Sequence, residues 1–586
     1  MIALVAGCCL GLVACDREQG EEIASPRAAA QEITLITQAR IHTFDPGDTV
    51  IASGAMAFSA DGEIVALGDP DAMLAAYPDA RRIDLGGRTV LPGLIDSHGH
   101  LYGLAQSLTR ADLVGTRSKE DLLERLRAFE AGLAADEWLL GRGWDQNDWP
   151  EPVFPDRADL DAAFPDRPVW LERIDGHAAW GNSRAIAQAD RDLSGDWQPE
   201  GGFIHRDPAG AATGIFVDGA MALVERAVPP TSPERMDAAL NRAGRLLASL
   251  GLTGVHDPGV DRAIVGIYRE KIADGTLPLR IYALADGPGP TLDWLCEHGR
   301  QQDPSGRLTL RAVKLYADGA LGSRGAALLD DYADQAGNRG LLFLADEQLE
   351  AQLRRVMSCG LQAGVHAIGD RANRQVLDAY QRLLPEYPDN PGRHRIEHAQ
   401  VVDPADIPRF ARLGVIAAMQ PIHATSDMYW ADERLGEARL AGAYAWRSLL
   451  GSGATLAFGS DFPVEQVNPM LGIYAAVTRR DLEGWPPGGW QPQERLSRVE
   501  AFRAYTLDAA RAAFMEDAVG SLEPGKRADF IVLERDPLAV PEAEIPTVRV
   551  LQTWLDGAKV FDVDAGEIPA RTGTHEAAVG QVLPGL

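Results

Sequence analysis

The chain has 586 residues, which is enough to bury a large core and to form more than one domain. Hydrophobic residues make up 46% of it and charged residues 24%, as is ordinary for a globular protein. The formal net charge of −29 argues against binding to nucleic acid or to anionic lipid, because both of these ligands attract basic surfaces.

The first residues are typical of an export signal. An apolar stretch ends in Leu12-Val-Ala-Cys15, and small residues before a cleavage point follow the pattern of secreted proteins. This run resembles a bacterial lipoprotein signal, so we expect residues 1–15 to be the signal, Cys15 to carry the lipid anchor and residues 16–32 to be a tether. The protein would then face the periplasm, anchored in the membrane or, alternatively, soluble. Because no Lys or Arg precedes the apolar run, a buried N-terminal strand is the competing interpretation.

The remaining cysteines do not form a disulfide framework. Three of the five cysteines lie in the first fifteen residues, so the folded body keeps only Cys296 and Cys359. Two cysteines this far apart in the sequence are compatible with free thiols or with one bridge, and the sequence does not decide between them.

Strand signals lie near both ends of the body. Asp61-Gly62 and Asp556-Gly557 each separate two apolar runs, which is the strongest short-range signal for a β-hairpin. We therefore predict one small β-sandwich domain built from residues 33–90 together with 515–565, followed by a C-terminal tail, 566–586.

The middle of the chain, residues 91–514, alternates apolar β runs with helical stretches, as parallel α/β folds do. We predict a closed (β/α)8 TIM barrel, because the eight strands that such a barrel needs can be assigned: Thr89–Asp96, Leu252–Asp257, Leu279–Ala285, Arg311–Ala317, Leu361–Ile368, His394–His398, Gly414–Gln420 and Ala454–Gly459. The gap after the first strand is too long for one helix, so we expect a subdomain inserted at about 112–245 that lies over the barrel mouth. Pro92 is a misfit for a central strand.

A histidine pair closes the first predicted barrel strand. His98 and His100 are one residue apart, and alternate side chains of an extended chain point the same way. Two imidazoles aimed at one point suit a metal such as zinc. Further ligand-type residues lie at or near the ends of the fourth, fifth, sixth and eighth predicted strands, which meet at one rim of a barrel: Lys314, His366, His398 and Asp461.

Each of these residues also has a structural interpretation. A single strand-end histidine is often a hydrogen-bonded core residue, and Asp461 can cap the turn that contains it. Lys314 is harder to explain in this way, because an ammonium between Val313 and Leu315 is costly to bury unless it is paired. Because all of the positions fall on one rim, we favour a functional site.

With these motifs the chain resembles the amidohydrolase superfamily, and within it amidohydrolase family 3, which includes N-substituted formamide deformylase. The resemblance covers nearly all of residues 33–565. It rests on seven segments: Leu91–His100, Asp175–Trp180, Val313–Ala326, His366–Arg371, Ile396–Gln400, Gly459–Pro463 and Val519–Leu533.

The resemblance implies one or two divalent metal ions, with zinc the first candidate. Their ligands would be His98 and His100 for one ion, and His366 and His398 for the second. Lys314 would react with CO2 to give a carbamate that bridges both ions. Asp461 would bind the first ion and carry a proton. The implied reaction is cleavage of a carbon–nitrogen bond, amide or formamide-like and not a peptide bond, by a metal-bound hydroxide.

The resemblance also implies substrate contacts. His177 would hold the substrate carbonyl, with a structural role beside Trp180 as the alternative, and Asp318 and Arg324 would be further contacts. Tryptophans of the insert indicate apolar or aromatic substrate groups: Trp144, Trp149 and Trp180. The expected partner is a small molecule and not a nucleic acid, with membrane attachment only through Cys15, and oligomerisation stays open.

Two other functions compete with this prediction. A mononuclear deaminase of the same superfamily is disfavoured, because such enzymes typically carry His-x-x-Glu after strand five, whereas Ala-Ile-Gly follows His366 here. A non-enzymatic binding lipoprotein on a degenerate barrel would lack some ligands, yet every expected ligand position holds a competent residue type.

Overall fold

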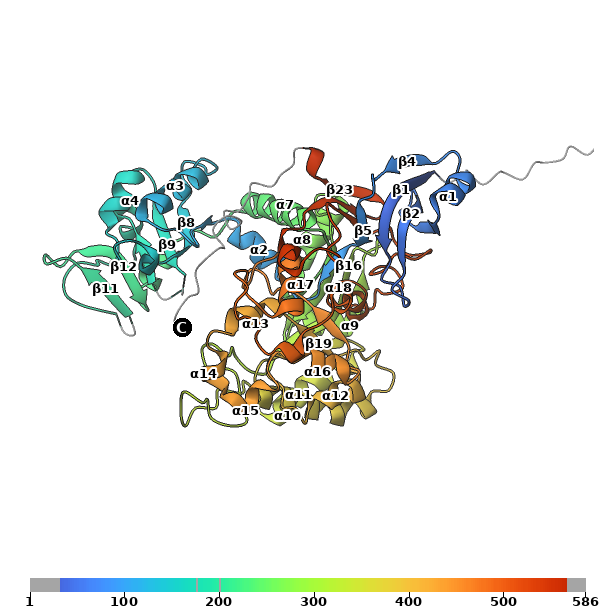
Figure 1. Cartoon of the computed structure of the whole chain (residues 1–586). Helices are drawn as coiled ribbons and strands as arrows, with labels where there is room; N and C mark the ends of the chain where they lie inside the picture. The colour runs from blue at the N-terminus through green and yellow to red at the C-terminus, as the bar shows by residue number, and fades with distance from the viewer. Residues whose placement is uncertain (1–31, 175, 177, 200–201, 566–586) are drawn as a thin grey trace, which may run out of the picture.

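The strands of the chain form three separate sheets, each built from a different part of the sequence (Figure 1). The computed structural model describes residues 32–174, 176, 178–199 and 202–565. Strands from both chain ends make one sheet, strands between residues 111 and 218 make a second, and the middle of the chain makes a third. Among the helices of these described residues, none has the length and apolarity needed to cross a bilayer.

Some of the sequence-based predictions lie outside the described residues. These are the signal with Cys15, the tether up to residue 31, the substrate contact His177 and the C-terminal tail 566–586. The residue boundaries that we assigned to the domains stay predictions.

The central sheet is the predicted TIM barrel. Eight of its nine strands pair in parallel, in chain order: β6 (Leu94–Asp96), β13 (Leu252–Val260), β14 (Arg280–Asp286), β16 (Leu308–Tyr316), β17 (Gln362–Ala367), β18 (Arg395–His398), β19 (Ile416–Met419) and β20 (Leu456–Phe458). The ninth, β15 (Gln301–Gln302), pairs only with β16. A backbone hydrogen bond of 3.0 Å from Ser97 N to Phe458 O joins the last strand to the first, so the barrel closes.

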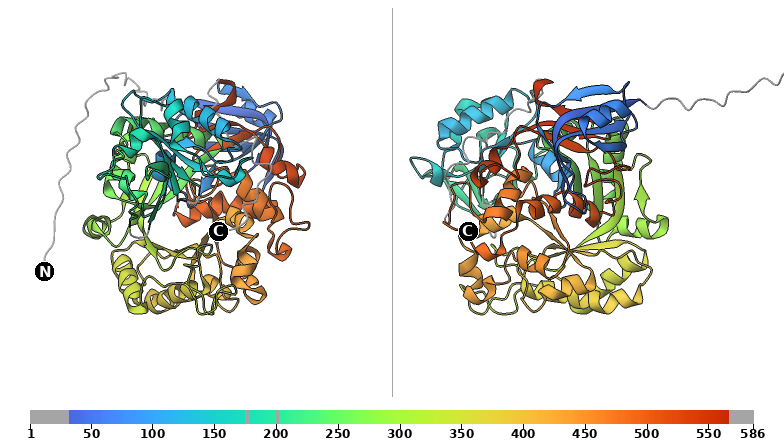
Figure 2. Two further views of the ribbon diagram at one scale, coloured as in Figure 1. Left: turned by 90° about the vertical axis from the view of Figure 1, so that its left-hand side faces the viewer. Right: turned by 45° about the vertical axis from the view of Figure 1, so that its right-hand side comes forward.

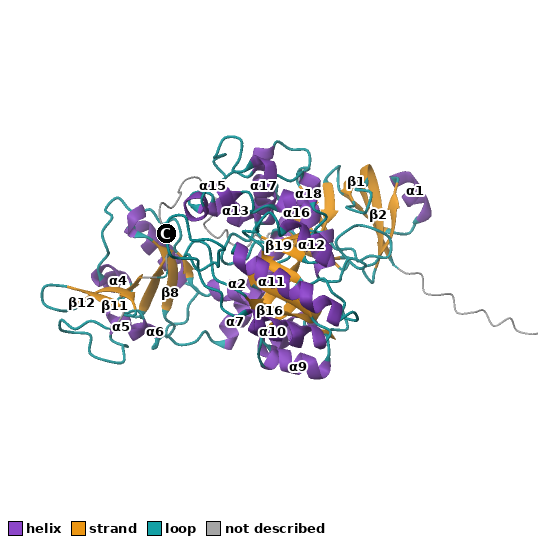
Figure 3. Cartoon of the chain, turned by 90° about the horizontal axis from the view of Figure 1, so that it is seen from below, coloured by secondary structure: helices purple, strands orange, loops and turns teal. Residues whose placement is uncertain are grey.

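Helices surround these strands, as Figure 3 shows. They are α2 (Leu101–Ser107), α7 (Pro233–Ser249), α8 (Arg262–Ala273), α9 (Pro290–His298), α10 (Asp346–Ser358), α11 (Asp370–Leu383), α12 (Ile407–Leu413), α13 (Pro421–Asp427), α14 (Ala431–Leu435), α15 (Glu437–Leu440), α16 (Trp446–Gly451), α17 (Pro469–Thr478), α18 (Arg498–Ala504) and α19 (Leu507–Ala512). Helix α7 begins at a capped turn, because the Ser232 hydroxyl accepts a hydrogen bond from Arg235 N and Pro233 opens the first turn.

The prediction of a single barrel strand over Thr89–Asp96 is wrong. It is two strands: β5 (Thr89–Pro92) belongs to the terminal sheet and β6 belongs to the barrel. Gly93 lies between them and donates a backbone hydrogen bond to Asp529 O. A Cβ at Gly93 would lie 2.2 Å from the Thr253 hydroxyl oxygen, so only glycine lets the chain pass from one sheet to the other here.

The terminal sheet confirms the β-sandwich made from both chain ends. Its strands follow the order β23-β22-β21-β5-β1-β2-β3, with β4 on the side of β1: β1 (Ile33–His42), β2 (Val50–Ser59), β3 (Ile64–Gly68), β4 (Arg81–Asp84), β21 (Phe530–Leu533), β22 (Val550–Leu555) and β23 (Ala558–Asp562), with helix α1 (Pro70–Ala76) on β2. In a flat sheet β2 and β22 would be roughly 19 Å apart, at about 4.8 Å per strand. The Phe58 ring is 5.9 Å from Trp554, so the sheet folds over on itself.

Both predicted hairpins are present, between β2 and β3 and between β22 and β23. Their turns contact each other, because a Cβ at Gly62 would lie 2.1 Å from Asp556 O. Two distant parts of the sequence are thus held together at their turns.

The insert has a six-stranded sheet in the order β11-β12-β10-β9-β8-β7. Its elements are β7 (Ala111–Asp112), α3 (Lys119–Glu130), β8 (Leu139–Trp144), α4 (Arg157–Ala163), β9 (Val169–Arg173), β10 (Ala178–Gly181), α5 (Ser183–Ile186), β11 (Gly202–Arg206), β12 (Ala212–Asp218) and α6 (Ala222–Glu225). In Figures 1 and 2 it lies on the other side of the barrel from the sandwich. Trp144, Trp149 and Trp180 pack on one another in its core, with ring centroids 6.1 to 6.5 Å apart. The indication that they contact substrate is therefore wrong.

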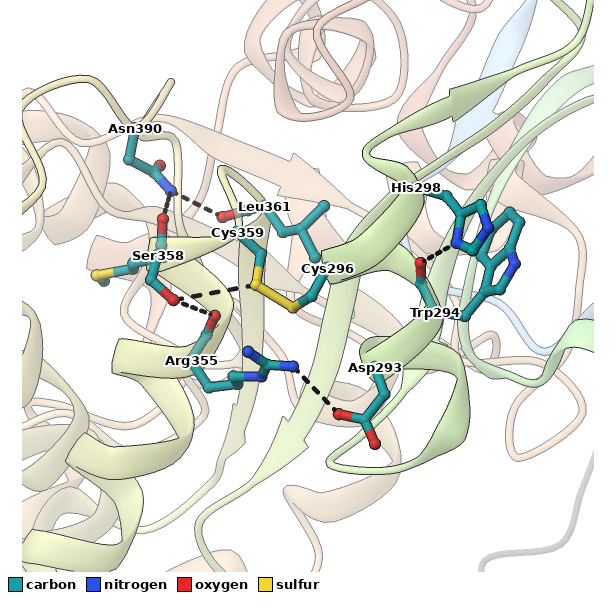
Figure 4. Close-up of a disulfide and its surroundings, with 10 residues drawn as sticks. Asp293, Trp294, Cys296, His298, Arg355, Ser358, Cys359, Leu361 and Asn390 are labelled. Atoms are coloured by element: carbon teal, nitrogen blue, oxygen red, sulfur yellow. Dashed lines mark hydrogen bonds and ion pairs between the residues drawn. A yellow bond between two sulfur atoms is a disulfide. The ribbon is translucent and has the colours of Figure 1, made fainter.

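A disulfide joins Cys296 in α9 to Cys359 at the end of α10 (Figure 4). The two helices follow β14 and β16, which are neighbours in the barrel. Beside the bridge, the Asn390 amide donates to the carbonyl oxygens of Met357 and Leu361. The question that the sequence left open, free thiols or one bridge, is answered in favour of the bridge.

Candidate metal centre

The six predicted ligands lie at the carboxyl ends of the barrel strands, where TIM-barrel active sites form. His98 follows β6, His100 directly precedes α2, Lys314 and His366 lie near the ends of β16 and β17, His398 ends β18, and Asp461 follows β20. Residues more than three hundred and sixty positions apart in the sequence therefore share one mouth.

Distances confirm that most of this set is close together. The Asp461 carboxylate lies 3.1 Å from Nε2 of His100 and 3.7 Å from Nε2 of His98. The His398 ring lies 4.8 Å from the His98 ring and 4.5 Å from the His366 ring, centroid to centroid. One ligand atom from each of His98, His398 and Asp461 can be chosen so that all three lie within 4.8 Å of one another, which is close enough to share one ion.

The donor atoms fit a divalent cation. Nε2 of His98 and Nε2 of His366 are buried and have no hydrogen-bond partner among the described residues. An unpartnered buried polar atom is costly, so each such atom in a native structure needs an explanation. Imidazole nitrogen and carboxylate oxygen are ordinary zinc ligands, and a cation here would satisfy both nitrogens.

The backbone holds two of these ligands in an unusual conformation. His398 has φ 75° and Asp461 has φ 62°, in the left-handed region that residues other than glycine rarely adopt. Such conformations cluster at functional sites, where the surrounding structure imposes them. Here Asp461 N donates a 2.7 Å hydrogen bond to His98 O, which ties the eighth strand end to the first.

The electrostatics favour neutral imidazoles at His98 and His366 and an ionised carboxylate at Asp461, whereas the contact with Asp461 raises the pKa of His100 against the effect of its burial. Burial lowers the pKa of His98 to about 4 and the pKa of His366 to about 3, and the Lys314 charge acts in the same direction. Burial alone would raise the pKa of Asp461, but the contact with His100 and the neighbouring imidazoles bring that pKa well below the ordinary carboxyl range. Both are the protonation states in which these groups bind metals.

Lys314 is buried in the mouth, and burial lowers its pKa to about 8 against the opposing charges of Glu397 and Asp461. Its Nζ lies 5.2 Å from the centre of the Tyr316 ring. It forms no ion pair with any residue that the structure describes, so the cost of burying it is not met by a carboxylate partner.

The predicted substrate contacts are less clearly placed. The Asp318 carboxylate accepts hydrogen bonds from the backbone N–H groups of Ala327, Ile368 and Gly369 at 2.8 to 2.9 Å, which favours a structural role. Arg324 pairs with Asp334 at 2.7 Å in a loop. The Asp318 carboxylate also lies 3.7 Å from Nε2 of His366, and the substrate roles of Asp318 and Arg324 both stay predictions.

Two further residues belong to this mouth. His423, in the first turn of α13, places Nε2 3.7 Å from the Asp461 carboxylate, and this nitrogen is buried without a hydrogen-bond partner among the described residues. Tyr316 ends β16, with its ring 6.0 Å from the His366 ring. The signal for His423 was its position, three residues after the seventh predicted strand; for Tyr316 it was the place beside Lys314.

A cavity of about 890 Å³ lies between the barrel and the insert. Tyr102 and Gln106 of α2 line its barrel side, and Trp170 and Glu172 of β9 line its insert side. The insert thus borders the helix that directly follows the histidine pair, although none of the six predicted ligands lines this cavity.

Comparison with known proteins identifies the family. The sequence model of the amidohydrolase family matches residues 81–561. The chain belongs to the amidohydrolase family. The Bacillus subtilis protein YtcJ, which is named as an amidohydrolase, is 35% identical to this chain over 515 residues. The match covers 86% of this chain and 95% of YtcJ. N-substituted formamide deformylase of Arthrobacter pascens is 28% identical over 561 residues, 90% of this chain and 98% of the deformylase.

Solved structures agree with this amidohydrolase assignment. A metal-dependent hydrolase of Pyrococcus furiosus has a TM-score of 0.70 and 32% identity, and the match covers 86% of this chain and all of that one. The enzyme class, a hydrolase, is confirmed, as is the resemblance on which it was predicted. Deaminase relatives match only short parts, for example 13% of this chain at 42% identity to one from Nitratidesulfovibrio vulgaris, so the deaminase alternative loses support.

Proposed function

We propose that this amidohydrolase cleaves a carbon–nitrogen bond in a small, non-peptide amide or formamide-like substrate at a divalent metal centre. The observation that carries the proposal is the convergence of histidines and Asp461 from separate strand ends, with Nε2 of His98 and Nε2 of His366 left without hydrogen-bond partners among the described residues. The name of the deformylase relative supports the type of bond.

In this proposal His98 and His100 hold one cation with Asp461, and His366 and His398 hold a second where two are bound, with zinc the first candidate. A cation in this site would act as a Lewis acid that polarises the substrate carbonyl and lowers the pKa of water. The neutral forms of His98 and His366 and the ionised form of Asp461 suit this role at neutral pH, whereas Asp461 raises the pKa of His100 against the effect of burial, so a cation bound there would displace a proton.

Lys314 is proposed to be carboxylated. The ammonium first loses a proton to give the neutral amine. The amine then attacks CO2, a nitrogen–carbon bond forms as one carbon–oxygen π bond breaks, and a second proton leaves. The buried cation would thereby become an anion with oxygen ligands. Two features support this: the lowered pKa of Lys314 increases the neutral fraction, and no described carboxylate pairs with its Nζ.

Asp461 is the proposed proton carrier. Because its carboxylate is ionised, it can accept the proton released from water and pass it to the leaving nitrogen, as general base and then general acid. Its two oxygens face different groups: Oδ1 faces His100 and His98, and Oδ2 faces His423. The Tyr316 ring, 38% exposed, borders the same space and would contact the substrate.

Export is part of the proposal. A lipid on Cys15 would hold the enzyme at the membrane on its periplasmic side. The Cys296–Cys359 bridge supports this location, because disulfides persist in oxidising compartments such as the periplasm. Labelled fatty acid should appear on the wild-type protein in membrane fractions and not on Cys15→Ala, and a Cys15→Ala protein that keeps both label and membrane association would contradict the anchor.

The function is tested with purified, metal-assayed protein against formanilides, N-acyl arylamides and aminopurines. Hydrolysis of an amide that stops after chelation and returns with zinc is expected. Release of ammonia from an aminopurine, with no amide cleaved, would favour the deaminase instead. Binding without turnover across all three groups would favour a binding protein.

A further inference from the structure

Two buried side chains contact the Nδ1 atoms of two imidazoles in the candidate metal centre, and these two side chains differ in charge. Glu397 Oε2 lies 2.6 Å from Nδ1 of His98, and Gln420 Oε1 lies 2.8 Å from Nδ1 of His398. We propose that Glu397 and Gln420 are positioning residues of the centre, and that the carboxylate makes His98 the stronger metal donor. This inference rests on the proposed function, since it presupposes that the centre binds metal.

The Glu397 carboxylate is fixed in place by Arg395, two residues earlier on β18. Arg395 Nη2 donates to Oε2 at 2.9 Å, and Nε lies 2.8 Å from Oε1, so the guanidinium spans both carboxylate oxygens. The same guanidinium donates to Ser97 O at 2.7 Å and lies 2.9 Å from Nδ1 of His256. Both charged side chains are 0% exposed. The pair therefore links three barrel strands directly below the histidine that it holds.

A glycine on the neighbouring strand leaves room for the Glu397 carboxylate. A Cβ at Gly364 on β17 would lie 2.6 Å from Glu397 Oε1, so the space that a side chain would take is filled by this oxygen. A buried ion pair with such fixed geometry keeps its charge, because removing either partner leaves an unpaired charge in the core. Glu397 thus presents a permanent anion to the back of His98.

Gln420 is oriented as well, but it is neutral. Its amide Nε2 donates to Ala418 O at 3.2 Å, which directs Oε1 towards His398. Both arrangements make Nδ1 the protonated nitrogen and leave Nε2 with the free lone pair. They differ in strength, since a hydrogen bond to an anion is roughly twice as strong as one to a neutral acceptor and raises the basicity of the imidazole more.

The test measures zinc binding by the full chain in competition with a chelator. Glu397→Gln should raise the zinc dissociation constant by roughly 10–100-fold. Gln420→Glu, which places a carboxylate behind His398, should lower it by roughly tenfold, in keeping with the strength of charge-assisted bonds. The unfolding temperature of each metal-free variant is measured in parallel.

Glu494→Gln is the matched control. Glu494 is also buried, and it accepts hydrogen bonds from Ser448 N and Oγ, away from any predicted ligand. Its variant should lose stability without a change in zinc affinity. A purely structural Glu397 would behave in the same way, so the zinc constant separates the two roles.

Each outcome is decisive. A Glu397→Gln protein that binds zinc within twofold of wild type overturns the inference, while the proposed function survives. If that variant does not fold, the zinc affinity of Gln420→Glu decides: tighter binding supports the inference, and equal or weaker binding overturns it. A wild-type protein that binds no zinc, cobalt or manganese overturns the proposed function itself.

Discussion

The two ends of the barrel both bury charged and polar groups, but they treat them differently. At the amino-terminal end, Arg280 begins β14 and contacts Asp529 of the sandwich at 2.5 and 3.0 Å, and it also pairs with Asp556. At the carboxyl end, Nε2 of His98 and Nε2 of His366 are buried without hydrogen-bond partners among the described residues, with carboxylate oxygens of Asp461 and Asp318 each 3.7 Å away. Groups that are fully paired hold the fold together, whereas groups left unpaired are available to a ligand. Substitutions at the two ends should therefore separate activity from stability.

The largest effect is expected for Lys314→Ala. If the lysine carries a carbamate, its removal deletes an anionic ligand that no neighbouring residue replaces, and turnover should be abolished. Added short carboxylic acids should restore part of the rate by occupying the vacated space. Full activity in the variant without added acid would contradict the carbamate. The readout is amide hydrolysis together with metal content.

Asp461→Asn should lower kcat by roughly 10²–10⁴-fold, the usual contribution of a general acid–base group. The amide keeps the size of the side chain but neither accepts nor donates the proton. The metal-free protein should also lose some stability, because the lowered pKa of Asp461 means that its ionised form stabilises the fold, so kcat is measured on the folded fraction. A variant that retains more than a tenth of the wild-type kcat would remove Asp461 from the proton path.

Arg280→Met should cost about 3–5 kcal/mol of unfolding free energy, because it leaves Asp529 buried without its charge partner. The activity of the folded fraction and its metal content should stay at the wild-type level. Urea unfolding monitored by tryptophan fluorescence measures the loss. Arg549→Ala, which removes the exposed pair with Glu534, is the control and should cost less than about 1 kcal/mol. Equal losses of unfolding free energy in Arg280→Met and Arg549→Ala would contradict a stabilising role for the buried pair at the amino-terminal end of the barrel.

The smallest effect concerns pH. The folded-state pKa of His98, about 4, is below the unfolded value of about 6.5, so the unfolded chain binds more protons between these values. The contribution of His98 to stability is complete above pH 6.5 and is lost as the pH falls towards 4. Between pH 7 and pH 5 the metal-free wild type should lose about 2 kcal/mol relative to His98→Gln. If the difference in unfolding free energy between wild type and His98→Gln, measured by urea unfolding, is the same at pH 7 and pH 5, the buried neutral imidazole is contradicted.

Much of the barrel could be read from the sequence, because strands that are buried on both faces give continuous apolar runs. The ligand positions followed from the same logic, since parallel strand ends share one rim. Pro92-Gly93 shows the limit: the run Thr89–Asp96 is continuous in composition, but its halves pair with different sheets, and pairing partners are not encoded locally.

Other features of the site also depend on contacts between distant residues. The substrate role that the resemblance implies for Asp318 stays a prediction, and nothing in the sequence pointed to its three hydrogen-bond donors, which come from residues 9 to 51 positions away. Trp144 lies in the core of the insert, and a tryptophan in a core has the same sequence signature as one in a pocket. His423 needed the position of Asp461, which only the folded chain supplies.

The passage of one chain segment from sandwich to barrel has a mechanical consequence. Strand β5 is flanked by β1 and β21, one from each chain end, and the residues that bear the histidine pair continue from it after a single glycine. Removing residues 516–565 would deprive β5 of one flank while leaving every predicted ligand in the sequence. The two chain ends thus hold β5 on both sides and fix the segment that leads to His98. We therefore expect the barrel to need both chain ends for an intact metal centre.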